Sequence, residues 1–206
     1  IRPNGGSAVG PDGAFWTGWM AGYGAYGGGI SRIDPATHEM TCWHDPVEGQ
    51  AISSIEADER YIYFVTCGEA NGLPYKEGRF SLCVWNGSRE EIKRITFGEG
   101  KRPSLLCNTE RYLAVSFGKS LEFFEKESFT SVKTVDFPKC DSDISCLVNI
   151  RNEKIGVFFT GRFAAVRLDT FEAGEWTEYR GRARSACICG ETLYFGADND
   201  LCRAGL

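Results

Sequence analysis

Six basic residues that could bind an anion occupy two kinds of connecting segment between predicted strands. Converging guanidinium groups bind carboxylates and phosphates through paired hydrogen bonds. In the fold predicted below, both kinds of segment open on one face, so we expect Arg102, Arg162 and Arg184 to converge there on an anionic ligand. The alternative is a solvated rim paired with acidic residues such as Glu99 and Asp141. The six residues are Lys101, Arg102, Arg162, Arg180, Arg182 and Arg184.

Two long glycine-containing segments add aromatic side chains to this expected site. Residues 20–28 follow Trp19 and carry Tyr23, and residues 69–78 carry Tyr75. Aromatic rings spaced by glycines offer flat faces that stack on sugars or other rings. We therefore predict that Trp19 or Tyr23 forms a wall beside the three arginines. The alternative is that these rings pack over the ends of the strands.

The sequence offers no recognisable catalytic or metal-binding motif. Its two histidines, His38 and His44, lie about a predicted outer strand, and it contains no Gly-x-Ser-x-Gly. The glycine-rich residues 22–29 lack the following Lys-Ser/Thr that a phosphate-binding loop requires. The cysteines include no Cys-x₂-Cys pair, which is the usual spacing of zinc ligands. We therefore predict no catalytic residue, no metal site and no cofactor.

Composition and charge narrow the class of partner. The chain of 206 residues has a net charge of −5, whereas a general nucleic-acid binder needs a dense positive surface. No apolar run approaches the roughly 18 residues of a membrane helix. The nine cysteines lie mostly inside apolar strands, which predicts reduced thiols and a cytoplasmic protein. The expected partner is a small-molecule or carbohydrate ligand or another protein, with no nucleic acid and no membrane.

A repeating unit of four short strands organises the sequence. Its second strand is the clearest, because it is an aromatic-rich run that ends in glycine and follows a turn such as Pro11-Asp12-Gly13. Four strands per unit with a period of roughly 45 residues are typical of β-propeller blades. A β-sandwich, the alternative, would not repeat the same second strand five times. The five runs are residues 14–18, 61–68, 112–118, 155–161 and 193–196.

These repeats predict an all-β fold, a single β-propeller domain of four-stranded antiparallel blades over residues 1–206. The chain would contain four complete blades and a partial fifth. The partial blade leaves open either a compact five-bladed ring with an incomplete outer edge or part of a larger ring, and we favour the larger ring. The predicted blades cover about residues 6–48, 49–100, 101–141, 142–181 and 182–206.

Side-chain alternation along the strands predicts two sets of buried residues. One set, on the second strands, should pack between adjacent blades. The other, on three successive first strands, should be reduced thiols near the centre of the ring. The first set is Phe15, Tyr63, Val115, Phe158 and Tyr194, and the second is Cys107, Cys146 and Cys187.

The first repeat also resembles blades of a known family. Gly10-Pro11-Asp12-Gly13-Ala14-Phe15-Trp16-Thr17, followed by Ile33-Asp34-Pro35-Ala36-Thr37, is similar to blades of the streptogramin (virginiamycin B) lyase and gluconolactonase-like propellers. The resemblance covers about one blade. It implies a propeller fold and, as an alternative function, a lyase or lactonase-like hydrolase that acts on a sugar-derived or lactone substrate. The family's catalytic histidines and glutamate have no matching motif in this sequence.

Residue types and fold together favour a non-catalytic role. We expect a ligand-binding or scaffold propeller whose ligand is an anionic carbohydrate or another carboxylate. The expected binding residues are Arg102, Arg162, Arg184, Trp19 and Tyr23.

Overall fold

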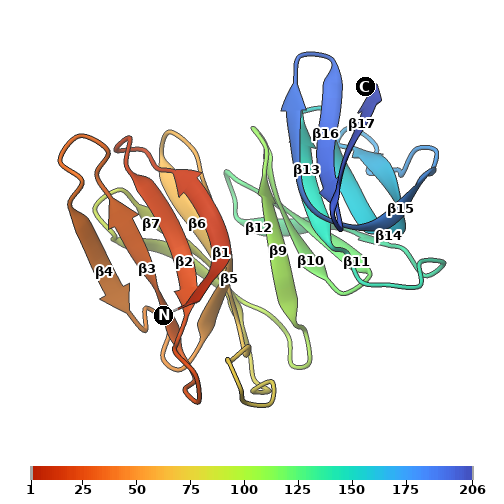
Figure 1. Cartoon of the computed structure of the whole chain (residues 1–206). Helices are drawn as coiled ribbons and strands as arrows, with labels where there is room; N and C mark the ends of the chain where they lie inside the picture. Colours follow the sequence, from red (N-terminus) through yellow and green to blue (C-terminus); the bar gives the residue numbers. More distant parts are fainter. Residues whose placement is uncertain (1, 206) are drawn as a thin grey trace. The chain divides into compact units, whose positions relative to one another are not determined.

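The computed structural model describes residues 2–205, with the side chains of residues 2–4 left out, and these residues form strands and turns without a helix (Figure 1). They divide into two compact units, residues 1–106 and residues 107–206, which we call unit 1 and unit 2. None of the described residues forms a helix long and apolar enough to cross a membrane. All the strand pairs are antiparallel, as the repeat predicts.

Unit 1 contains two four-stranded sheets in which each strand pairs with the next along the chain. We call them blade 1 and blade 2. Blade 1 comprises β1 (Arg2–Val9), β2 (Phe15–Met20), β3 (Gly28–Ile33) and β4 (Met40–His44). Blade 2 comprises β5 (Ala51–Ala57), β6 (Tyr61–Cys67), β7 (Ser81–Asn86) and β8 (Glu91–Thr96).

A third sheet of the same order, blade 3, follows, and the boundary between the two units falls within its first strand. Its strands are β9 (Pro103–Asn108), β10 (Tyr112–Phe117), β11 (Ser120–Glu125) and β12 (Thr130–Asp136). The outer strand β12 is almost wholly exposed, whereas β10 is buried along most of its length. Buried inner strands and an exposed outer strand are expected of a propeller blade.

The last sheet joins the fourth and fifth repeats. Its strands are β13 (Cys146–Ile150), β14 (Lys154–Arg167), β15 (Thr177–Cys189), β16 (Thr192–Ala197) and β17 (Asp200–Gly205). β14 folds back on itself at Gly161, whose φ is +82°. The evidence is a hydrogen bond at 2.9 Å from the Leu168 amide to the Glu153 carbonyl. A fully extended chain would hold those two residues roughly 50 Å apart. The rings of Phe158 and Phe163, one on each arm, stack at 4.9 Å.

β15 likewise serves two repeats, since residues 177–182 pair with β14 and residues 183–189 pair with β16. We therefore call β13, both arms of β14 and residues 177–182 blade 4. Residues 183–189, β16 and β17 form blade 5, which has three strands. Four complete antiparallel blades and a partial fifth are what the sequence predicts.

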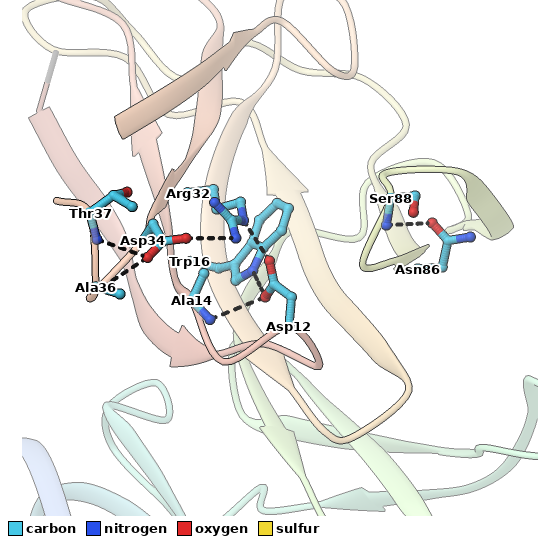
Figure 2. A network of polar contacts seen from close by, with 9 residues as sticks. All are labelled: Asp12, Ala14, Trp16, Arg32, Asp34, Ala36, Thr37, Asn86 and Ser88. Carbon is cyan, nitrogen blue, oxygen red and sulfur yellow. Dashed lines mark hydrogen bonds and ion pairs between the residues drawn. The ribbon is translucent and has the colours of Figure 1, made fainter. Parts of the chain in front are cut away.

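Turn carboxylates hold the first hairpins of blades 1 and 2. Asp12 accepts hydrogen bonds from the Ala14 amide at 3.2 Å and the Trp16 indole at 3.0 Å, and it also pairs with Arg32 (Figure 2). In blade 2, Asp58 accepts from two backbone amides of its turn and from the Tyr63 hydroxyl at 2.7 Å. Asp and Asn favour such turns because their side chains bond the nearby backbone.

The core of unit 1 lies between blades 1 and 2. Trp16, Ile52 and Phe64 are fully buried there. Gly18 allows the two sheets to approach, because a Cβ at that position would lie 2.5 Å from the Ile52 side chain. In unit 2 a second core joins blade 4 to blade 5, with Phe158 and Phe195 among its members.

The prediction that five second-strand residues are buried is confirmed at three positions and wrong at two. Tyr63, Val115 and Phe158 are fully buried. Phe15 is 47% exposed, because its chain neighbours Ala14 and Trp16 lie in the core and Phe15 points to the opposite face. Tyr194 is half-buried, because it faces away from the core that blade 5 shares with blade 4.

The prediction of three buried thiols is likewise confirmed at some positions and wrong at another. All nine cysteines lie within the described residues, and none of them forms a disulfide. Cys107 and Cys146 are 3% and 6% exposed, as predicted. Cys187 is exposed, contrary to the prediction, because it shares the outer face of blade 5 with Tyr194.

Candidate functional site

Two long loops of unit 1 lie against each other. Loop 1 (residues 21–27) follows β2, and loop 2 (residues 68–80) follows β6. The Gly24 amide donates to the Asn71 carbonyl at 2.8 Å, and the Tyr26 hydroxyl donates to the Pro74 carbonyl at 3.1 Å. Both are segments in which the sequence predicted ligand-binding aromatic residues. We call the surface that they form together the loop pair.

Tyr23 is the most exposed aromatic residue of the loop pair. Its ring lies over Gly72 of loop 2, where an added Cβ would approach the ring edge to 2.3 Å and where φ is +81°. Glycine is therefore required beneath this ring on both steric and conformational grounds. The ring remains 82% exposed, so it offers one face to a ligand.

Two cations accompany these tyrosines. The Lys76 ammonium lies 5.6 Å from the centre of the Tyr26 ring, and the Arg102 guanidinium lies 4.5 Å from the centre of the Tyr75 ring. Arg102 also pairs with Glu77, and both of these side chains are more than half exposed. The loop pair thus combines exposed aromatic faces with positive charge.

Tyr75 lies beneath Arg102 and packs edge-on against Phe80 at 5.7 Å. Its hydroxyl is the one buried side-chain oxygen or nitrogen of the described residues without a hydrogen bond of normal geometry, although it lies near the Gly68 amide. Burial raises the pKa of Tyr75 to about 12, so the hydroxyl keeps its proton at neutral pH. It therefore remains available as a donor.

Trp19 occupies a different position from the predicted wall. It is 4% exposed, its indole donates to the Ser31 hydroxyl at 3.0 Å, and His44 packs edge-on against it at 5.0 Å. Its ring covers Gly29 on the neighbouring strand. A ligand could reach the face of Trp19 only by displacing it from this packing.

Arg162 and Arg184, the other predicted anion ligands, belong to unit 2. The Arg162 guanidinium lies 5.8 Å from the centre of the Trp176 ring. Arg184 is exposed on β15, and the described residues supply it with no ion pair. Arg102 belongs to unit 1, so the convergence of all three arginines stays a prediction.

Unit 2 also has a groove that the sequence did not suggest, with a volume of about 590 Å³. It forms at turns that join first to second strands and third to fourth strands, whereas the predicted site used the other two kinds of connection. Both of its arginines form ion pairs, Arg111 with Glu125 and Arg167 with Asp169, each at 3.0 Å. Its lining residues are Glu110, Arg111, Tyr112, Asn152, Glu153, Lys154, Arg167, Leu168 and Asp169. The charged residues crowded into these turns are the signal that could have revealed it.

Nucleophilic and metal-ligating side chains are not gathered into a site. His38 lies in the turn before β4 and His44 ends that strand, which separates them by roughly 15–20 Å of extended chain. No group of three or more His, Cys, Asp or Glu residues within the described part of the chain could hold a metal ion. Burial raises the pKa of Cys67 and of Cys83 to about 12, which keeps these thiols protonated and unreactive.

Comparisons with known proteins identify the fold and no family. No family model and no curated protein matches the chain. Among solved structures, a chain of the "Crystal Structure of Mitotic Checkpoint Complex" is similar with a TM-score of 0.73 and 6% sequence identity. The similarity covers 94% of this chain and 56% of that chain, so this chain spans a little over half the length of the chain it matches. The likeness shows a β-propeller fold, and nothing in it favours the streptogramin lyases.

Proposed function

We propose that this protein is a non-catalytic binding or scaffold propeller and that the loop pair of unit 1 receives an anionic carbohydrate or another carboxylate ligand. The observation that carries the proposal is the exposure of Tyr23 and Tyr26 beside the cations Lys76 and Arg102. A sugar ring can stack on an exposed tyrosine. A carboxylate on that sugar would then meet positive charge at the same surface.

The Arg102 ion pair is compatible with ligand exchange. Both Arg102 and Glu77 are more than half exposed, and exposed ion pairs contribute only about 0–1 kcal/mol. A ligand carboxylate can therefore replace Glu77 at little cost, while the stacking of Arg102 on Tyr75 keeps the guanidinium in place.

A scaffold role and a cytoplasmic location belong to the same proposal. Cysteines without disulfides are expected of a reducing compartment. The structurally similar chain belongs to a complex, which is one use of a propeller of this fold. The enzymatic alternative, a lyase or lactonase, has only the turns of blade 1 in its favour, and these turns stabilise the blade itself.

Calorimetric titration with oligogalacturonate at low and physiological salt tests the proposal. We expect binding that weakens several-fold at physiological salt, because screening acts over about 8 Å there. Tyr23→Ala and Arg102→Ala should each reduce the affinity at least tenfold. The matched control is Arg60→Ala, since Arg60 also lies over a tyrosine ring, at 5.5 Å, but in the turn at the other end of β6.

Arg184→Ala measures whether the site extends to unit 2. An affinity loss as large as that of Arg102→Ala would support the convergence of the predicted arginines, and an unchanged affinity would confine the site to the loop pair. Equal binding of a neutral oligosaccharide would contradict an anion site. Binding that survives Tyr23→Ala and Arg102→Ala would contradict the location.

A further inference from the structure

An asparagine–glycine pair opens the turn between β7 and β8 of blade 2. Asn86 ends β7, Gly87 follows it, and β8 begins at Glu91. Asn86 and Gly87 are half-buried, and the three residues after them are exposed to water. The loop pair contains no residue of this turn, because loop 2 precedes β7 and the turn follows it.

The Asn86 side chain is held by the backbone of its own turn. Its Oδ1 accepts hydrogen bonds from the Ser88 amide at 3.0 Å (Figure 2) and from the Glu90 amide at 2.8 Å. Its Nδ2 donates to the Glu90 carboxylate at 3.1 Å. The Gly87 amide lies between Asn86 and Ser88 in the chain, so the bond to Ser88 brings the side-chain carbonyl carbon of Asn86 close to the Gly87 nitrogen.

This geometry favours attack of the Gly87 nitrogen on the Asn86 side chain. After the Gly87 amide gives its proton to hydroxide, its nitrogen forms a bond to Cγ of Asn86, and negative charge develops on Oδ1. The amides of Ser88 and Glu90 already point at that oxygen, as the donors of an oxyanion hole do. Glycine has no Cβ to obstruct the approach. The Cγ–Nδ2 bond then breaks, Nδ2 takes a proton from water and leaves as ammonia, and the hydroxide is regenerated. A cyclic imide remains.

Water opens this imide in one of two ways. Cleavage of the new bond to Cγ gives aspartate in place of Asn86. Cleavage at the main-chain carbonyl gives isoaspartate, in which the main chain runs through the former side chain. We propose that Asn86 is a site of such spontaneous deamidation and that the conversion loosens the contact between blade 2 and blade 1.

The same turn positions that contact. The Arg89 amide donates to the Asn86 backbone carbonyl at 2.9 Å, and the Arg89 guanidinium lies 4.5 Å from the centre of the Trp43 ring. Trp43 stacks in turn on Trp16 of the core, with the ring centres 5.3 Å apart. Aspartate would replace the Nδ2 donor by an oxygen that faces the Glu90 carboxylate, and the two like charges would repel each other. Isoaspartate would add a methylene group to the main chain within the turn, so the Arg89 backbone would have to move.

Asn71-Gly72 of loop 2 is a matched control within the same chain. By residue type alone the two pairs would react alike. The Tyr23 ring lies over Gly72, which restricts the access of hydroxide and water to its amide. The structure therefore favours reaction at Asn86 over reaction at Asn71.

Incubation of the folded chain at neutral and at mildly alkaline pH, followed by tryptic peptide mapping with mass spectrometry, tests the proposal. Trypsin releases the two asparagines on different peptides, residues 80–89 for Asn86 and residues 61–76 for Asn71. We expect the aspartate and isoaspartate forms of the first peptide to accumulate several-fold faster than those of the second. Both forms should accumulate faster at the higher pH, because the attacking amide must lose its proton.

Gly87→Ala tests the nucleophile. It keeps Asn86 and its hydrogen bonds but puts a methyl group beside the attacking nitrogen, so it should slow the reaction of Asn86 several-fold. The added Cβ would lie 3.3 Å from the Pro11 side chain, which needs only a small adjustment. The reaction of Asn71 should be unchanged in this variant.

Asn86→Asp reproduces one product and measures its consequence. This variant should unfold at a lower temperature than the wild type, and the decrease should be smaller when Arg89→Ala has already removed the contact with Trp43. Reaction at Asn86 that is no faster than at Asn71, or as fast in Gly87→Ala as in the wild type, would overturn the deamidation site. An Asn86→Asp variant as stable as the wild type would overturn the loosening of the blade contact.

Discussion

The first hairpins of blades 1 and 2 are both held by a turn carboxylate, but the two carboxylates have different distant partners. Asp12 receives the Trp16 indole and the Arg32 guanidinium, whereas Asp58 receives the Tyr63 hydroxyl. The local turn chemistry is shared by the two blades. The distant partners are the side chains that each blade supplies, an indole and a guanidinium in blade 1 and a hydroxyl in blade 2.

The largest effect should come from removing either carboxylate. Asp12→Ala leaves the buried Trp16 indole without its acceptor and Arg32 without its closest partner, and should lower the free energy of unfolding by about 3 kcal/mol. Asp58→Ala removes the carboxylate that accepts from the buried Tyr63 hydroxyl and should cost about 2 kcal/mol. Urea unfolding of both variants measures the difference. A larger loss for Asp58→Ala would reverse our ranking of the two turns.

Tyr63→Phe should have a smaller effect than either carboxylate substitution. It removes one hydrogen bond but leaves Asp58 with the two turn amides, Arg60 at 2.8 Å and Tyr61 at 2.9 Å. We expect a loss of about 1 kcal/mol in the same urea experiment. The Tyr63→Phe, Asp58→Ala double variant is the control, since it should be no less stable than Asp58→Ala alone if the hydroxyl acts through Asp58.

Acid should weaken blade 1 through Asp12. Burial alone would raise the pKa of Asp12, but the hydrogen bonds from Trp16, Arg32 and Ala14 outweigh it and hold that pKa below its ordinary value of 3.8. A carboxyl with a lowered pKa stabilises the fold fully above 3.8, and this contribution is lost as the pH falls through the lower folded-state value. Thermal unfolding between pH 5 and pH 2 should therefore show a smaller acid-dependent decrease for Asp12→Asn than for the wild type. Equal decreases would contradict this account.

The smallest effect concerns a contact between the two blades. Arg89 of blade 2 adopts φ +68° and places its guanidinium 4.5 Å from the centre of the Trp43 ring of blade 1. Arg89→Ala should cost about 0.5–1 kcal/mol through the lost cation–π contact. Arg89→Gly loses the same contact but relieves the positive φ, so it should be more stable than Arg89→Ala in matched thermal unfolding.

Much of this architecture could be predicted from the sequence because its signals are local. Turn residues such as Asp12 and Asp34 bond the backbone two or three residues away. The aromatic second strands recur because each one fills the same place in its blade. The division of β14 into two arms could likewise be predicted, since Gly161 is the glycine that ends the fourth second strand.

The side-chain register of the strands could not be predicted as well. Adjacent residues of β6, such as Tyr63 and Phe64, are both fully buried, so alternation does not show which face is inward. Transferring that pattern to β2 put Phe15 in the core in place of Trp16. The predictions for Cys187 and Tyr194 were wrong for another reason. Their residue types match an interior blade, but the described residues do not cover the outer face of blade 5.

Contacts between distant residues were the hardest part of the candidate site to foresee. Arg102 pairs with Glu77 and lies over Tyr75, both in a loop far earlier in the chain. Trp19 packs over Gly29, its direct partner on β3. The run of glycines at 27–29 opposite a tryptophan is a signal that a ring covers the backbone there, and it could have placed Trp19 in the core.

The reversal of β14 at Gly161 has a practical use for anyone who modifies this protein. The chain turns there without a loop, between Thr160, which is exposed, and Arg162, which is half-buried. Loop tips with small or polar residues tolerate inserted sequence better than other positions do. A peptide tag placed after Gly161 would extend from this turn, and a spectroscopic reporter there would signal the folding of blade 4.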